Sequence, residues 1–242
     1  MKTLIIIPSR MSASRLPGKP LLKINGISII SHAYKKAESA NIGEVIVAAE
    51  DQEIIDDVKS NGGNAVLTSK NHKTGTDRIF EAFNILKRND VDFIMNVQGD
   101  EPDIDVEDIK TLDIKMKSNE GEIGTLAANI LKEDIYKDVN IVKVKIKEPF
   151  EKNSFPQARN FMRKIENKID VYHHIGIYSY NLNTLKRFVS FDQSQNELKN
   201  KLEQLRALDN NITINVALAK KSPIGVDTKE DYLALKKIMK YK

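Results

Sequence analysis

Short apolar runs alternate, through the first hundred residues, with longer segments that have helical spacing. The apolar runs at 4–8, 44–49, 65–67 and 92–97 have the length of strands, and the intervening segments have the period of helices. This alternation is typical of strand–helix–strand units around a mostly parallel sheet. We therefore predict an α/β fold whose first half is doubly wound.

The second half of the chain is less regular. Residues 148–170 are polar, contain two prolines and have no clear period, so no element is predicted there. Strands are predicted at 123–130, 140–146 and 175–180, and helices at 195–208 and 228–241.

Charge and composition restrict the possible functions. The 38 Lys and Arg residues against 34 Asp and Glu leave a net charge of +4, too little for a dedicated nucleic-acid binder. Absence of cysteine excludes disulfides, thiolate metal sites and a cysteine nucleophile, so oxygen-binding hard cations are the expected metals. The apolar run at 4–7 is too short for a signal peptide or a membrane span. We expect a soluble cytoplasmic protein without membrane insertion.

A basic loop at 9–20 follows the first predicted strand. Arg10 and Arg15 can each bind phosphate oxygens through two N–H groups, and Lys19 adds a compact charge. A solvated basic loop is the alternative, because the segment has neither P-loop nor dinucleotide-binding glycine spacing. Ligands of open α/β sheets bind at the carboxyl ends of the strands, where this loop would lie.

Three further residues are candidates for chemistry. Asp100 follows the strand at 92–97 and could bind Mg²⁺, or could simply belong to a turn. Asp227 could do the same, or could cap the last helix. His174 could be a ligand-binding residue, although a histidine beside a strand is more often packed or exposed. Asp51 is expected to cap the helix that follows it.

Seven motifs resemble those of one enzyme family. They are I-I-I-P-S-R and S-R-L-P-G-K-P-L within 5–21, T-G-T-D-R at 74–78, N-V-Q-G-D-E-P at 96–102, H-I-G-I-Y-S-Y at 174–180, L-E-Q-L-R at 202–206 and G-V-D-T at 225–228. In their order and near their spacing, these motifs resemble the sugar-activating cytidylyltransferases, specifically the 3-deoxy-manno-octulosonate (Kdo) cytidylyltransferase family. The resemblance covers residues 1–146 and 172 to the end.

The resemblance implies a fold and a reaction. The fold is a mixed, mainly parallel sheet of the nucleotide-diphospho-sugar transferase (Rossmann-like) type. It forms a single domain at 1–242, with a subregion at about 123–181 for sugar binding and dimer contact. CTP would react with Kdo to give CMP-Kdo and pyrophosphate for lipopolysaccharide synthesis, in a Mg²⁺-dependent homodimer.

The resemblance also implies roles for individual residues. Lys19, Asp100 and Asp227 would be catalytic, and both aspartates would bind Mg²⁺. The nucleotide would be bound by Pro8, Ser9, Arg10, Arg15, Lys19, Thr76, Arg78 and Gln98. The sugar would be bound by Gln98, Arg163, His174, Tyr178, Glu203 and Gln204, with Arg163 on its carboxylate.

The segment 148–172 departs from the family pattern. Met162 replaces a serine, no proline follows, and the stretch before His174 is shorter than in the family. An 8-amino-Kdo or another nonulosonic-type acid is therefore an alternative acceptor. A nucleotide-binding protein without turnover is a more remote alternative, because binding alone would not require both Asp100 and Asp227.

Overall fold

The computed structural model describes residues 1–12, 15–165 and 167–239. Residues 13–14 of the basic loop and the end of the helix predicted at 228–241 lie outside the described residues. The chain groups into two compact units, Met1–Ile109 with Pro223–Lys242, and Lys110–Ser222. The expected single domain with a subregion at about 123–181 stays a prediction.

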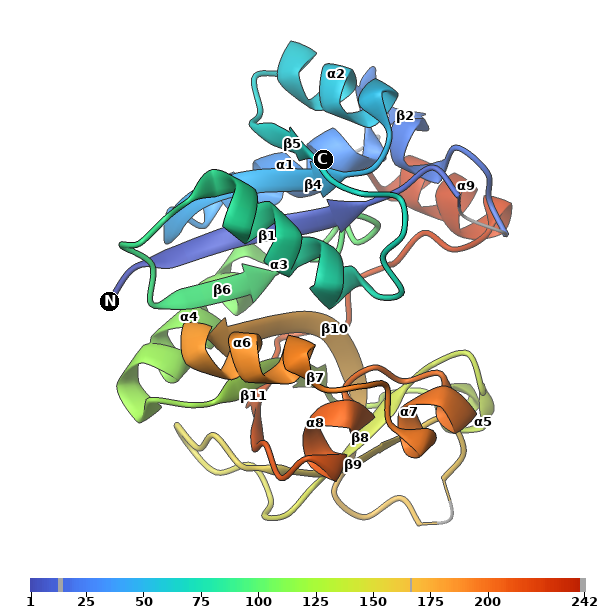
Figure 1. The fold of residues 1–242 in the computed structure, drawn as a ribbon. Coiled ribbons are helices and arrows are strands. Elements are labelled where there is room, and N and C mark those ends of the chain that lie inside the picture. The colour runs from blue at the N-terminus through green and yellow to red at the C-terminus, as the bar shows by residue number, and fades with distance from the viewer. Residues whose placement is uncertain (13–14, 166, 240–242) are drawn as a thin grey trace. The chain divides into compact units, whose positions relative to one another are not determined.

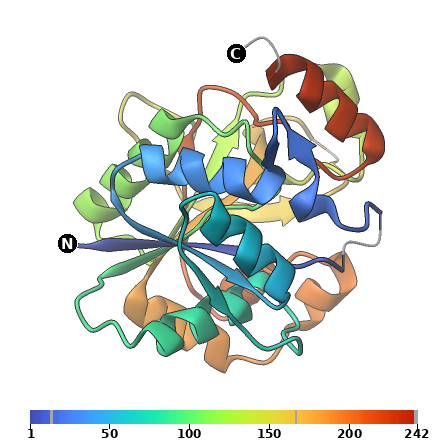
Figure 2. The same ribbon diagram turned by 90° about the horizontal axis from the view of Figure 1, so that it is seen from above.

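The first unit contains a parallel sheet in the order β6-β1-β4-β5. Its central strand β1 has a continuous apolar run between Thr3 and Ser9, and every residue except Pro8 is buried, as expected for a strand covered on both faces. Helices α1 and α3 lie on opposite faces of this sheet (Figures 1 and 2). The strands are β1 (Thr3–Ser9), β4 (Gly43–Ala49), β5 (Ala65–Leu67) and β6 (Phe93–Asn96), and the helices are α1 (Ile29–Ser39), α2 (Gln52–Ser60) and α3 (Gly75–Leu86).

The end of the chain packs onto a small hairpin of the same unit. The hairpin consists of β2 (Lys23–Ile24) and β3 (Ile27–Ser28), preceded by the short 3₁₀ helix η1 (Lys19–Leu21). Helix α9 (Lys229–Met239) lies beside it, at the red end of the chain in Figure 2. Buried Ile24, Ile29, Val226 and Leu235 form one apolar cluster there. This packing brings the segment before α9 close to the basic loop.

The second unit contains a mixed arrangement of strands. β7 pairs with β11 in parallel and with β10 antiparallel, while β8 pairs antiparallel with both β10 and β9. Helix α4 (Val106–Asn119) crosses from the first unit into the second. The other elements are β7 (Ile123–Ala128), α5 (Glu133–Lys137), β8 (Lys143–Ile146), β9 (Ala158–Met162), β10 (Val171–Asn181), α6 (Leu182–Ser190), α7 (Gln195–Asn200), α8 (Leu205–Asp209) and β11 (Ile214–Leu218).

The α/β fold with a mixed, mainly parallel sheet is confirmed, and two local predictions are wrong. The single helix predicted at 195–208 is two helices, because Lys201 has φ of 52° and ends α7 in the left-handed conformation. Asp51 occupies the cap position of α2, but its side chain makes no capping hydrogen bond. Strand β9 was not predicted, because two consecutive exposed polar residues, Arg159 and Asn160, interrupt the alternation of apolar and polar residues that marks a strand.

No helix among the described residues is long and apolar enough to cross a bilayer.

Candidate active site

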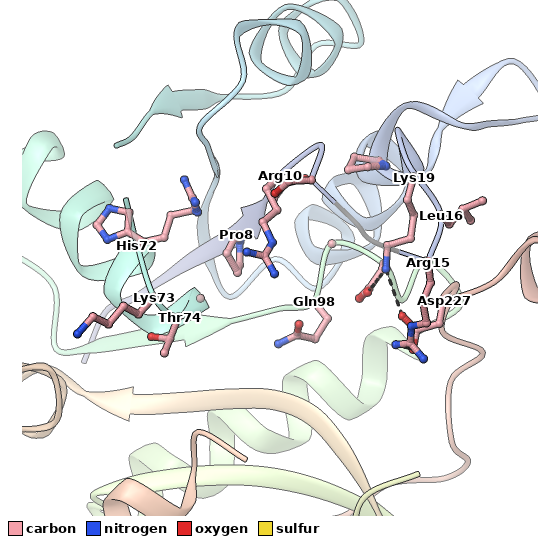
Figure 3. Close-up of a pocket in the computed structure, with 17 residues that line it drawn as sticks. Pro8, Arg10, Arg15, Leu16, Lys19, His72, Lys73, Thr74, Gln98 and Asp227 are labelled. Carbon is pink, nitrogen blue, oxygen red and sulfur yellow. Dashed lines mark hydrogen bonds and ion pairs between the residues drawn. The ribbon is translucent and has the colours of Figure 1, made fainter. Parts of the chain in front are cut away.

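A pocket of about 380 Å³ lies in the first unit, at the carboxyl ends of β1 and β6. Figure 3 shows side chains of the basic loop, of the segment before α3 and of the turn after β6 around it. Most of its polar lining is basic or amide in character, which suits an anionic ligand. The lining residues are Pro8, Ser9, Arg10, Ser12, Arg15, Leu16, Lys19, Pro20, His72, Lys73, Thr74, Gly75, Arg78, Gln98, Gly99, Asp100 and Asp227.

Lys19 is held at the start of η1, directly after a tight turn. Gly18 has φ of 70°, a left-handed conformation that glycine adopts without strain, and its N–H bonds to the carbonyl of Met11. The Lys19 side chain is 13% exposed, and its Nζ lies 2.6 Å from Oδ2 of Asp100 and 3.4 Å from Oδ1 of Asp227. One ammonium group therefore bridges both predicted metal carboxylates.

The turn after β6 places Asp100 against the end of β1. Gly99 permits this close approach, because a Cβ there would lie 2.8 Å from Cδ1 of Ile30 and 3.3 Å from the carbonyl oxygen of Pro8. The carbonyl of Asp100 accepts a hydrogen bond from the N–H of Val226 at 2.9 Å. This main-chain bond brings the segment of Asp227 beside Asp100.

The side chain of Asp227 is not used to cap α9. The carboxylate of Asp231 accepts bonds from the N–H groups of Asp227 and Thr228, and the hydroxyl of Thr228 accepts the N–H of Asp231. Asp227 instead faces two cations, since its Oδ2 lies 2.9 Å from the Arg15 guanidinium. The expected capping arrangement is therefore present before α9, with the hydroxyl of Thr228 rather than the carboxylate of Asp227 as the cap.

A third carboxyl group lies behind this pair. Oε2 of Glu101 is buried and has no hydrogen-bond partner among the described residues. Burial, together with the neighbouring charges of Asp100 and Asp227, raises the pKa of Glu101 to about 8. A carboxyl group with this pKa is mostly protonated at neutral pH. Asp100 and Asp227 therefore carry the negative charge at this corner of the pocket, and Lys19 pairs with both.

The opposite wall of the pocket is the beginning of α3. The hydroxyl of Thr74 caps the helix by accepting the N–H of Asp77 at 3.3 Å, so the first turn presents its positive end beside Gly75. Arg78 also lines the pocket, with a side chain that is 4% exposed and paired with Glu50. Thr76 is 1% exposed and is not among the lining residues.

Arg10 differs from the other two loop cations. Its side chain points into the pocket near Pro8 (Figure 3). Within the part of the chain that the structure describes, no ion pair forms on its guanidinium, whereas Arg15 and Lys19 are both paired with carboxylates. Arg10 can therefore bind an anion without first giving up a partner.

The predicted sugar residues other than Gln98 lie in the second unit. His174 is 9% exposed, and its Nε2 lies 3.0 Å from the hydroxyl of Tyr178 and 3.1 Å from that of Thr125. Burial, and to a lesser extent His173, lowers the pKa of His174 to about 3. His174 is therefore neutral at physiological pH.

Arg163 forms a network with the main chain. Its guanidinium donates to the carbonyls of Val139, Asn140, Asn200 and Lys201 at 3.1–3.4 Å. Two of these carbonyls belong to the turn that leads to Glu203 and Gln204 between α7 and α8. The same turn is held by a buried ion pair in which Arg206 binds both oxygens of Glu197 at 2.8 and 2.6 Å.

The structure brings most of the predicted nucleotide residues together. One pocket is lined by Pro8, Ser9, Arg10, Arg15, Lys19, Arg78, Gln98, Asp100 and Asp227, whereas Thr76 is not among the lining residues. Sequence reasoning did not select the lining residues Ser12, His72, Lys73 and Thr74. It also did not select Glu50, which pairs with Arg78, or Glu101, whose Oε2 is buried. The acidic pair of Glu50 and Asp51 directly after a buried strand is a signal that could have drawn attention to that position.

Comparison with known proteins assigns this pocket to a family. The family model described as cytidylyltransferase matches residues 4–214. The chain belongs to the cytidylyltransferase family. Its relatives include the 3-deoxy-manno-octulosonate cytidylyltransferase of Thermodesulfovibrio yellowstonii, 41% identical over 96% of this chain and 95% of that protein. The protein of the same name from Rhodopseudomonas palustris is also 41% identical, over 98% of both chains.

Solved structures agree with this assignment. A CMP:2-keto-3-deoxy-manno-octonic acid synthetase complexed with CTP superposes on this cytidylyltransferase with a TM-score of 0.90 and 32% identity, covering 100% of this chain and 99% of that one. A UDP-glucose pyrophosphorylase shares the fold with a TM-score of 0.71 at 12% identity, covering 100% and 99%. The predicted nucleotide-diphospho-sugar transferase fold and the resemblance to the Kdo cytidylyltransferases are confirmed.

Proposed function

We propose that this cytidylyltransferase transfers CMP from CTP to the anomeric hydroxyl of Kdo and releases pyrophosphate. The observation that carries the proposal is the array of Arg15, Lys19, Asp100 and Asp227 around one pocket at the strand ends. The 41% identity to Kdo cytidylyltransferases over nearly the whole chain supports CTP and Kdo as the substrates. A non-catalytic nucleotide-binding protein would have no need for this arrangement of cations and carboxylates.

The reaction needs positioning and charge neutralisation more than a protein nucleophile. The acceptor hydroxyl attacks the α-phosphate in line while negative charge builds on the departing pyrophosphate. Arg10, Arg15 and Lys19 supply cations for that charge, and the first turn of α3 adds N–H groups at Thr74 and Gly75. These groups are preorganised by the turn at Gly18 and by the Thr74 cap, so little reorganisation is required during the reaction.

The donor set fits Mg²⁺, which we include in the proposal. Asp100 and Asp227 offer carboxylate oxygens that both lie close to the ammonium group of Lys19. Mg²⁺ is commonly bound through one or two carboxylates together with substrate phosphates. When bound, the ion would polarise the phosphate and neutralise charge on the leaving group. Lys19 would then be free to turn toward the phosphates.

We propose that the acceptor is recognised by Gln98 and by the predicted residues of the second unit. The neutral His174 and Tyr178 can exchange hydrogen bonds with sugar hydroxyls. Glu203 and Gln204 follow the turn that Arg163 and Arg206 hold in place. The proposal further includes a homodimer in the cytoplasm that supplies CMP-Kdo for lipopolysaccharide synthesis, and light scattering of the purified protein tests the dimer.

Pyrophosphate release tests the reaction. Each of the four ribonucleoside triphosphates is supplied with Mg²⁺, alone and with Kdo, 8-amino-Kdo or N-acetylneuraminate. We expect release with CTP and Kdo together and little with any other pair. Equal turnover with UTP or ATP would overturn CTP as the substrate. Faster turnover with 8-amino-Kdo would replace the acceptor and keep the reaction class.

A further inference from the structure

Asp51 lies at the carboxyl end of β4, where it is expected to cap α2. Its backbone has the extended conformation of a cap residue, with φ of −115° and ψ of 126°, but its side chain bonds to none of the helix N–H groups. Oδ2 of Asp51 instead accepts the N–H of Met11 at 2.8 Å, forty residues earlier in the chain. The carboxylate thus gives up a local bond that stabilises helices and makes a long-range bond to the basic loop.

Met11 makes main-chain hydrogen bonds to Asp51 and to the far end of the basic loop. Its N–H is bound by Asp51, and its carbonyl accepts the N–H of Gly18 at 3.4 Å. Arg10 immediately precedes Met11, and Lys19 immediately follows Gly18. The bond from Asp51 therefore fixes the point from which both of these cations extend into the pocket.

We propose that Asp51 is a positioning residue for the triphosphate of the nucleotide. By holding the N–H of Met11, it sets the base of the loop so that Arg10 and Lys19 converge on phosphate oxygens. This inference rests on the proposed function, because it takes the pocket to be the CTP site. Asp51 itself is not among the lining residues and touches no substrate in this scheme.

The direction in which polyphosphate affinity changes when Asp51 is removed distinguishes a positioning role from a purely electrostatic one. A carboxylate close to an anion site repels the anion, so its removal should strengthen polyphosphate binding if charge were its only contribution. If Asp51 orders the loop, its removal weakens binding, because Arg10 and Lys19 must then be ordered when the ligand binds. The two explanations predict changes of opposite direction for one substitution.

Calorimetric binding without an acceptor sugar tests the proposal. CTP and inorganic tripolyphosphate, each with Mg²⁺, are titrated into wild type, Asp51→Ala, Asp51→Asn and Glu53→Ala. UTP with Mg²⁺ is titrated into wild type. Asp51→Asn retains an oxygen that can accept the Met11 N–H. Glu53 is an exposed acid in the first turn of the same helix, so Glu53→Ala is the matched control for loss of charge. Melting temperatures are recorded for each variant to establish that it is folded.

We expect Asp51→Ala to raise the dissociation constants of both ligands by about tenfold, the loss expected for one charge-assisted hydrogen bond. Asp51→Asn should recover most of this loss, and Glu53→Ala should show none. Unchanged or tighter binding by Asp51→Ala, or equal weakening by Glu53→Ala, would overturn the proposal. If the wild type binds UTP as tightly as CTP, the proposed function fails, while the tripolyphosphate titrations still decide the role of Asp51.

Discussion

At the scale of single residues, Lys19 decides how the pocket balances its charges. Its side chain is 13% exposed, and its ammonium group bridges Asp100 and Asp227, which would otherwise repel each other. A lysine suits this position because its flexible side chain can carry the compact ammonium group from carboxylate to phosphate oxygens. The planar guanidinium of an arginine presents its N–H donors in a rigid geometry.

Substitution of Lys19 should reduce catalysis far more than folding. We expect Lys19→Ala to lower kcat/KM for CTP by about 10²-fold to 10³-fold, the range for removing one preorganised donor of transition-state charge. Steady-state pyrophosphate release measures the effect. Lys23→Ala, which removes an exposed lysine of the neighbouring hairpin, is the control. Unchanged kinetics for Lys19→Ala would favour a merely solvated loop.

The two aspartates should be individually essential. We expect Asp100→Asn and Asp227→Asn each to reduce turnover by about 10²-fold to 10⁴-fold at saturating Mg²⁺, because removal of a metal carboxylate costs several kcal/mol of transition-state stabilisation. Melting temperatures should not fall much, since both side chains are partly exposed and each substitution also relieves repulsion between the two carboxylates. Glu230→Gln, an exposed acid in the first turn of α9, is the matched control. A loss of less than about tenfold would mean that the metal lies elsewhere.

At the scale of elements, a few main-chain bonds arrange the segments around the pocket. The turn after β6 reaches the segment before α9 through one bond from Val226 to Asp100, and α9 is anchored on the β2–β3 hairpin. Tyr232 on α9 donates to the carbonyl of Lys23 at 2.7 Å. The last helix therefore contributes to the site by placing Asp227, although it supplies no side chain to the pocket itself.

In the second unit, Arg163 links segments that are distant in sequence. Arg163→Lys conserves the charge. An ammonium group, however, cannot reproduce the hydrogen bonds that the planar guanidinium donates to four main-chain carbonyls. We expect a lower melting temperature and a rise in the KM for Kdo well above any rise for CTP, because the nucleotide pocket belongs to the first unit. Steady-state kinetics with each substrate varied measures both constants. A Kdo KM within about twofold of wild type, together with a strong rise for Lys164→Ala, would assign the sugar carboxylate to Lys164 instead.

At the scale of the whole molecule, the buried neutral His174 makes the free energy of unfolding depend on pH. The pKa of His174 is about 3 in the folded protein against 6.5 for an unperturbed histidine. Between these values the unfolded chain binds a proton that the folded protein does not, so stability falls as the pH is lowered from about 6.5 toward 3. Above pH 6.5 this histidine has no effect on the pH dependence.

His174→Gln should therefore flatten the acid side of the stability profile. Its hydrogen-bonding neighbours Thr125 and Tyr178 keep a polar partner in this variant, so the protein should remain folded. Melting temperatures between pH 7 and pH 4 measure the slope, with His32→Gln as the control from a partly buried histidine of the first unit. A slope identical to that of wild type would mean that His174 is protonated in the folded state.

Much of the fold and of the site could be predicted from local pattern. Apolar strand runs, their spacing and the basic loop after β1 indicated an α/β nucleotide-binding architecture, because strand and helix periods depend on neighbouring residues. The motifs at Lys19, Asp100 and Asp227 pointed to one site, and the structure places all three in one pocket.

Tertiary structure alone decided what those side chains contact. Asp51 and Asp227 occupy positions where a cap is the local expectation, but their carboxylates bind a loop N–H and two cations that lie far away in sequence. The break between α7 and α8 likewise accompanies the buried pair of Glu197 and Arg206. The sequence by itself determined the main strands and helices of the first unit, since those preferences are local. Long-range bonds and burial compete with local ones at small differences in free energy, so the partners of each charged group emerged only from the folded chain.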